Sequence, residues 1–170
     1  MDTWLAIASR REVREYADTE LPGDVVDRIL DAGRLAGSAS NKQPWRFLVV
    51  ESAGLREQVA EHVYEVDNVR GAKLVVALSV SGKGPISFDA GRAAQNMVLA
   101  AWNDGVGSCP NGMPDSEATG RLLGLDDGER LVIVLSFGYP AEPRDPESRS
   151  PEEWSRRANR KPLEEIVTRL

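Results

Sequence analysis

The sequence predicts a single domain of the α+β class, in which helices and strands alternate along 170 residues. Apolar residues recur at helical spacing in several segments, and continuous β-branched runs typical of buried strands lie between them. Glycines and prolines stand at the boundaries of these segments. A chain of this length can bury about two-thirds of its unfolded surface. We therefore expect one domain, covering residues 1–170.

The first half of the chain carries two helix and two strand predictions. Apolar residues at helical spacing, with a proline early and a glycine just past the end, predict a helix over 21–37. The run RFLVVE at 46–51 predicts a buried strand. A stripe of leucine and valines predicts a helix over 54–66. The β-branched run KLVVALSV at 73–80 gives the clearest strand signal of the chain.

The longest predicted helix covers 87–105. Ser87 is its expected N-cap, Asp89 suits the positive first turn, and Gly105 suits the position after the last turn. The alanines along one face form a small-residue stripe, which allows another element to approach closely. A short helix is expected over 114–125.

The chain changes character after the strand predicted at 130–138. Residues 139–151 hold several prolines, so they cannot form a regular element. A capping box between Ser150 and Glu153 then predicts a brief helix. The last segment, 162–170, has a short apolar stripe at helical spacing that is not stable alone. It must dock on its own body or on a second copy, and we favour the second copy.

The composition argues against several classes of protein. The 27 acidic and 21 basic residues give a net charge of −6, which does not suit wrapping a nucleic acid. No apolar run approaches the roughly 20 residues that span a bilayer, so no membrane partner is expected. The charges of the N-terminus follow its apolar stretch, the reverse of a secretory signal, and indicate a cytoplasmic protein. A single cysteine and a single histidine argue against a disulfide framework and a metal site.

Two clusters of cations stand out in this acidic chain. Arg10, Arg11 and Arg14 lie near the N-terminus, and the run RRANRK at 156–161 lies near the end. One interpretation is a solvated surface with arginines paired to neighbouring carboxylates, which charge statistics alone favour. The other is a phosphate held by guanidinium groups, which bind such oxygens bidentately. The sequence contains no GxxxxGK(S/T) motif, and no GxGxxG motif follows a strand and opens a helix. A nucleotide would therefore be held in another way.

A turn rich in small polar residues precedes the first predicted strand. Ser38, Ser40, Asn41 and Gln43 offer neutral donors and acceptors within six positions, beside Gly37. Such groups suit the edge of a planar, polar heterocycle. An ordinary helix-to-strand loop, in which serine and asparagine are common, explains them equally well.

Five blocks of the sequence resemble the FMN-dependent nitroreductases, in the order that the family has. They are RREVREY, SASNKQPWRFLVV, FDAGRAAQNMVLAAWNDGVGSC, LVIVLSFGYP and NRKPLEEIV, and they span nearly the whole chain. The combination of NKQPWRF with DAGRAAQN and GYP is specific. The resemblance implies a three-layer α/β/α fold with a central, mostly antiparallel sheet. It also implies an extended C-terminal arm, 139–170, exchanged in a homodimer.

The resemblance implies an FMN cofactor at the subunit interface. The arginines of both clusters would hold its phosphate and ribityl chain, and the serine turn of the other subunit would line the isoalloxazine. Asp89 would lie near the pyrimidine edge, and a backbone N–H near Gly112 or Met113 would face flavin N5. The cofactor-binding residues expected from the turn and from the resemblance are Arg10, Arg11, Arg14, Ser38, Ala39, Ser40, Asn41, Gln43, Asp89, Pro110, Asn111, Gly112, Met113 and Arg160.

The activity that the resemblance implies is NAD(P)H-dependent reduction of nitroaromatic, quinone or similar electron-poor acceptors. Nicotinamide and acceptor would visit one flavin face in turn, which predicts ping-pong kinetics. The flavin carries the chemistry, so no catalytic side chain is assigned. Glu12 replaces the family's usual serine, and segment 52–86 is short. A flavin-binding carrier or sensor without turnover, or a flavin- or deazaflavin-processing relative, therefore stays open as an alternative.

Overall fold

The computed structural model describes residues 1–170 and divides them into two compact units. The first unit joins both ends of the chain, Met1–Arg10 and Asp145–Leu170, and the second is Arg11–Arg144. A single domain with an extended arm beyond residue 138 stays a prediction. None of the helices combines the length and apolar character that crossing a bilayer requires.

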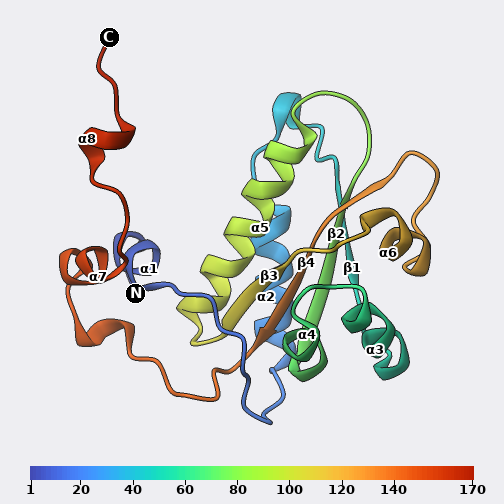
Figure 1. The fold of residues 1–170 in the computed structure, drawn as a ribbon, viewed down its shortest axis with the longest axis horizontal. Helices are drawn as coiled ribbons and strands as arrows, with labels where there is room; N and C mark the ends of the chain where they lie inside the picture. The colour runs from blue at the N-terminus through green and yellow to red at the C-terminus, as the bar shows by residue number, and fades with distance from the viewer. The chain divides into compact units, whose positions relative to one another are not determined.

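The second unit is built on one four-stranded sheet with the order β1-β2-β4-β3, in which every neighbouring pair is antiparallel (Figure 1). The strands are β1 (Trp45–Val49), β2 (Leu74–Val80), β3 (Gly107–Asn111) and β4 (Arg130–Gly138). Three of them confirm the sequence predictions. The edge strand β3, with sequence GSCPN, was not predicted because it has no apolar run and contains a proline, which sheets tolerate at edges.

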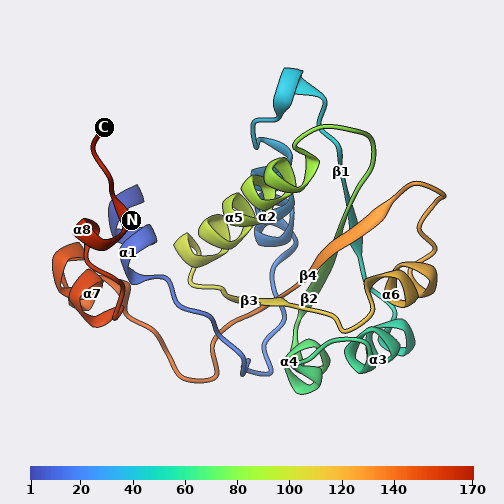
Figure 2. The same ribbon diagram turned by 45° about the horizontal axis from the view of Figure 1, so that its top comes forward.

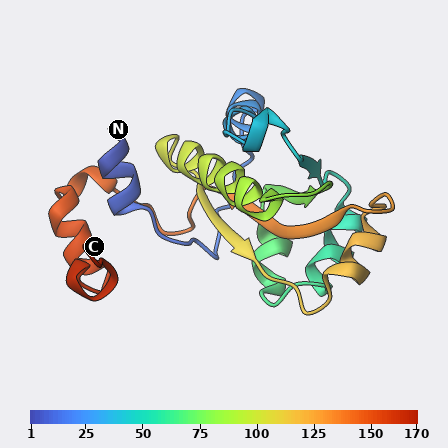
Figure 3. The same ribbon diagram turned by 90° about the horizontal axis from the view of Figure 1, so that it is seen from above.

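Helices cover both faces of this sheet, as the resemblance implied (Figure 3). The two faces are set by strand β2, which is buried along its whole length. The helices are α2 (Gly23–Arg34), α3 (Ala53–Glu61), α4 (Val66–Gly71), α5 (Ile86–Asn103) and α6 (Ser116–Leu122). Leu74 and Val76 pack with α2 and α5, whereas Val75 and Ala77 pack with α3 and α4, because successive side chains of a strand point to opposite faces.

Two details of the predicted helices are wrong. The helix expected over 54–66 ends at Glu61, because the next residues turn toward the end of β3, where the Tyr64 amide donates to the Gly112 carbonyl at 3.0 Å. Helix α5 begins at Ile86 with Pro85 at its N-cap, so Ser87 lies inside the first turn instead of capping it. Gly105 follows the helix with a φ of 75°, as predicted.

The first unit is helical. It contains α1 (Thr3–Ser9), the 3₁₀ turn Pro146–Ser148, α7 (Pro151–Arg157) and α8 (Leu163–Ile166). Helices α1 and α7 lie side by side (Figure 2). The predicted capping box between Ser150 and Glu153 is present. The short apolar stripe at 162–170 forms only one helical turn, α8, and its apolar side chains are exposed, so its docking on a second copy stays a prediction.

Candidate functional site

The first part of the candidate site is the arginine segment, Arg11–Arg14, which lies along strand β3. Glu12 pairs with Ser108 in a parallel bridge, and the Val13 amide donates to the Ser108 carbonyl at 3.0 Å. Strand β3 contains Pro110 and Asn111 and leads directly into Gly112 and Met113. Two parts of the predicted site that are far apart in the sequence are therefore neighbours in the fold.

Close contact at Gly107 allows this pairing. A Cβ atom built on Gly107 would lie 2.7 Å from Cβ and Cγ2 of Val13, closer than real Cβ atoms approach. Val13 is buried against this bare backbone, while Arg14 is exposed and its Nε lies 3.9 Å from Glu65 Oε1. An exposed ion pair of this length contributes little to stability, so the Arg14 guanidinium is available to a ligand.

The residues at the end of β3 and directly after it, Pro110–Met113, differ in which of their groups are exposed. Pro110 is exposed, and Gly112 and Met113 are half-buried. The Asn111 side chain points into the interior, where Nδ2 donates to the Cys109 carbonyl at 3.0 Å and to Ser136 Oγ at 3.1 Å. The backbone of this segment, and not the Asn111 amide, is therefore what a ligand can contact.

The second part of the candidate site is the turn between α2 and β1. Ser38 Oγ accepts a hydrogen bond from the Gln43 amide at 2.8 Å, and Gln43 Nε2 donates to the Asn41 carbonyl at 3.2 Å. Ser40, Asn41 and Gln43 have φ values of 52°, 54° and 49°, in the left-handed region. Each such residue costs on the order of 1 kcal/mol or more, and the surrounding contacts maintain it. The turn is therefore preformed, with Ser40 and Asn41 exposed at its tip.

Asp89 holds this turn from helix α5. Its side chain is buried, with 2% exposed, and Oδ2 accepts a hydrogen bond from the Ala39 amide at 3.1 Å. Oδ1 lies 3.9 Å from Nη1 of Arg92, one turn along the helix. The carboxylate thus links α5 to the turn, and its predicted role near a flavin edge stays a prediction.

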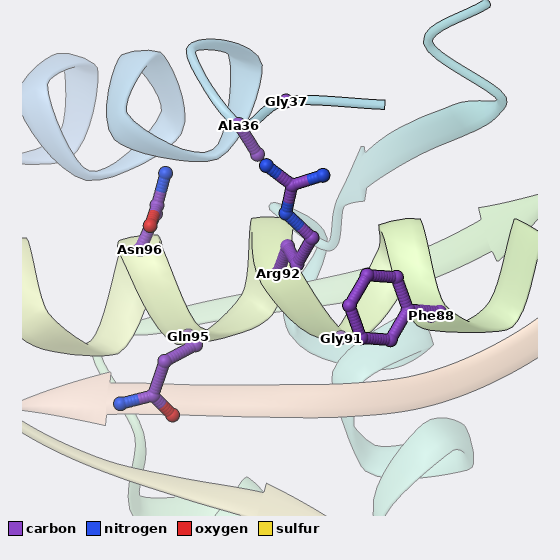
Figure 4. Close-up of a pocket in the computed structure, with 7 residues that line it drawn as sticks. All are labelled: Ala36, Gly37, Phe88, Gly91, Arg92, Gln95 and Asn96. Atoms are coloured by element: carbon purple, nitrogen blue, oxygen red, sulfur yellow. The ribbon is translucent and has the colours of Figure 1, made fainter. Parts of the chain in front are cut away.

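A cavity of about 380 Å³ lies beside the turn, between the end of α2 and the outer face of α5 (Figure 4). Arg92 points toward Gly37, where an added Cβ would lie 2.3 Å from Nη2, so a larger residue at position 37 would displace the end of the Arg92 side chain. The exposed Phe88 ring lies 5.8 Å from the Arg92 guanidinium carbon. Sequence reasoning missed both residues, although their spacing of four on a helix places them on one face.

Sequence reasoning also missed Arg144. It borders a cavity of about 270 Å³ together with Arg14, in the stretch where the Ala141 amide donates to the Glu15 carbonyl at 3.0 Å. Arg10 and Arg160 belong to the first unit, and their contact with a phosphate stays a prediction.

Tyr16 follows the arginine segment and anchors its C-terminal end. Its hydroxyl donates to the Val13 carbonyl at 2.9 Å and lies 3.0 Å from Ser136 Oγ. Burial raises the pKa of this hydroxyl to about 12, against about 10 in an unfolded chain. Tyr16 is therefore a neutral hydrogen-bond donor across the range in which proteins work.

This raised pKa predicts a loss of stability in alkali. The unfolded chain releases the Tyr16 proton from about pH 10 and the folded chain only near 12, so the stability contribution present below pH 10 falls between these values, by up to about 2–3 kcal/mol. Urea unfolding at pH 9, 10 and 11 measures the decline. In Tyr16→Phe the decline should be shallower than in the wild type. If the free energy of unfolding falls equally with pH in both proteins, the Tyr16 hydroxyl is not the cause of the decline.

Comparisons with known proteins match most of the chain, including the arginine segment, the polar turn and β3. The chain matches the model of the Nitroreductase family over residues 7–83 and 85–139. A protein of Methanothermobacter thermautotrophicus, provisionally named NADH dehydrogenase/NAD(P)H nitroreductase, is 34% identical over an alignment of 151 positions that covers 84% of this chain and 79% of that protein. An iodotyrosine deiodinase of Thermotoga neapolitana is 26% identical, and the match covers 79% of this chain and 87% of the deiodinase.

The similarity extends to solved structures. A provisionally named nitroreductase of Desulfovibrio desulfuricans, solved in complex with FMN, is 29% identical and superposes with a TM-score of 0.83. The superposition covers 100% of this chain and 98% of that one.

Proposed function

Because this chain belongs to the nitroreductase family, we propose that it is an FMN-dependent NAD(P)H oxidoreductase that reduces electron-poor acceptors such as quinones and nitroaromatics. The observation that carries the proposal is the position of the arginine segment along β3, next to Pro110–Met113. The FMN complex of the Desulfovibrio desulfuricans relative supports the choice of cofactor.

The described residues fit an FMN molecule at both of its ends. Arg11 and Arg14 flank the bridge to β3 and offer guanidinium groups suited to a phosphate. The turn that contains Ser40 and Asn41 is preformed and exposes neutral side chains, which suit the polar edge of a flavin ring. Arg10 and Arg160 remain proposed contacts of the same phosphate.

The residues of this chain would bind and orient the cofactor, and FMN, when bound, supplies hydride acceptance from NAD(P)H and hydride donation to the acceptor. The half-buried backbone of Gly112 and Met113 would support the ring from behind. The opposite face then stays open to nicotinamide and acceptor in turn, which is the basis for ping-pong kinetics. No side chain is assigned as an acid or base.

We also propose that the active protein is a homodimer. The apolar side chains of Leu163, Ile166 and Leu170 near the C-terminus are exposed by 62% or more. Burying such side chains against a second copy would stabilise the assembly by about 25 cal/mol for each Å² of apolar surface removed from water. The exposed turn at Ser40 and Asn41 would then contribute to the site of the partner.

Anaerobic reduction by a nicotinamide tests this function. The purified protein should be yellow, NADH or NADPH should bleach it rapidly in the absence of oxygen, and menadione should restore the colour. A yellow protein that neither nucleotide bleaches would contradict the enzyme and indicate a flavin carrier or sensor. An absorbance spectrum unlike that of FMN would contradict the cofactor and indicate a ligand such as a deazaflavin.

A further inference from the structure

Four polar side chains form a buried cluster between the arginine segment and the sheet: Tyr16, Asn68 on α4, Asn111 at the end of β3, and Ser136 on β4. The two asparagines and the serine are at most 3% exposed. Buried polar groups cost stability unless their hydrogen bonds are made, and apolar residues would fill the same space without that cost. A cluster of four at one place therefore calls for a structural reason.

Asn68 connects the cluster to the backbone of the arginine segment. Its Nδ2 lies 3.0 Å from the Arg14 carbonyl and 3.4 Å from the Val13 carbonyl, and it donates toward both. It also lies 3.1 Å from the Tyr16 hydroxyl, which in turn donates to the Val13 carbonyl at 2.9 Å. Two successive carbonyls of the segment are thus held by side chains.

Ser136 connects the same cluster to the end of β3. Its hydroxyl donates to Asn68 Oδ1 and accepts from Asn111 Nδ2 at 3.1 Å. A consistent order of donors results: Asn111 donates to Ser136, Ser136 to Asn68, Asn68 to Tyr16, and Tyr16 to Val13. This order links strand β3, which leads into Gly112 and Met113, to the backbone that carries Arg14.

We propose that Asn68 and Ser136 are positioning residues that hold the arginine segment in the geometry needed for the FMN phosphate. The inference rests on the proposed function. Backbone hydrogen bonds hold this stretch as well: the Val13 amide donates to Ser108, the Ala141 amide to Glu15, and the Ala17 amide to Tyr139. The side-chain donors add anchors at the Val13 and Arg14 carbonyls, so the Arg14 backbone is ordered before the ligand arrives. Ordering in advance reduces the entropic cost of binding.

The preference for FMN over riboflavin isolates this role, because the two ligands share the ring and differ in the phosphate. Dissociation constants for both are measured by quenching of flavin fluorescence in the apoprotein. In Asn68→Ala the constant for FMN should rise by about tenfold, while that for riboflavin changes much less. A general loss of stability would weaken both ligands together and leave their ratio unchanged.

Two serines of the same sheet give a matched control. Ser136 and Ser79 are both fully buried, but Ser79 Oγ approaches only Glu129 at 3.4 Å and lies outside the cluster. Ser136→Ala should lower the preference for FMN, and Ser79→Ala should not. Tyr16→Phe, which keeps the ring and removes one hydroxyl, should lower the preference by a smaller factor and serves if Asn68→Ala does not fold.

The outcomes separate the two proposals. Suppose that the wild-type protein prefers FMN, and that the ratio of its dissociation constants for riboflavin and FMN is unchanged in Ser136→Ala and in Tyr16→Phe. This result would overturn the positioning role alone. Wild-type protein that binds neither flavin, or binds FMN no tighter than riboflavin, would overturn the proposed phosphate site and the positioning role with it.

Discussion

Replacing Arg11 and Arg14 together with alanine should give a folded protein that is purified without colour. Each guanidinium that contacts phosphate contributes a charge-assisted hydrogen bond of about 1.5–3 kcal/mol. Arg14 is exposed, so we expect the lower end of this range, which for two residues corresponds to roughly 100-fold weaker FMN binding. Flavin absorbance after purification and a titration with added FMN measure the loss.

The folded state should survive this change, because the anchors of the segment are backbone groups and buried side chains. The control is Arg121→Ala with Arg130→Ala, which removes the same charge at two exposed positions on α6 and β4. This control should stay yellow. If the Arg11 and Arg14 variant keeps the wild-type content of FMN, the phosphate is held elsewhere.

Gly107→Val should separate the arginine segment from β3. The new Cβ would lie 2.7 Å from Cβ and Cγ2 of Val13, and the Val13 Cβ can move away only together with the backbone that pairs at Ser108. Overpacking of this kind costs about 1–3 kcal/mol of stability. FMN affinity should fall as well, since the segment and Pro110–Met113 would no longer be adjacent. Urea unfolding and flavin titration measure the two effects.

Gly71→Val is the matched control, because nothing lies within 4 Å of a Cβ at that position in α4. It should change FMN affinity little, and valine has a higher helix propensity than the glycine that it replaces. Wild-type stability and FMN affinity in Gly107→Val would show that the contact at Val13 is not needed.

The sequence predicts those parts of the fold that local pattern determines. The runs at 73–80 and 130–138 are continuous and apolar, so their strands were found, and the three layers followed from the resemblance. The edge strand at Gly107–Asn111 has no such pattern, because its position depends on pairing with β4. The break between α3 and α4 depends on a contact of Tyr64 with Gly112, which no local signal announces.

The candidate site shows the same division. Its polar turn was recognisable from the types of its residues, yet the sequence does not show that Asp89 holds the turn through the Ala39 amide. The pairing of Glu12 with Ser108 joins segments that are far apart in the chain. The position of the arginine segment beside β3 could therefore not be predicted from the spacing of residues in the sequence. The inward direction of the Asn111 side chain is likewise a result of tertiary packing.

A crystal structure of the yellow protein with its flavin tests the central claim most directly. The account predicts that the FMN phosphate lies within hydrogen-bonding distance of guanidinium groups from the arginine segment. It also predicts that the ring lies against the backbone of Pro110–Met113 and near the Ser40 turn of a second copy. A phosphate bound away from Arg11 and Arg14, or a flavin enclosed by one copy alone, would contradict it.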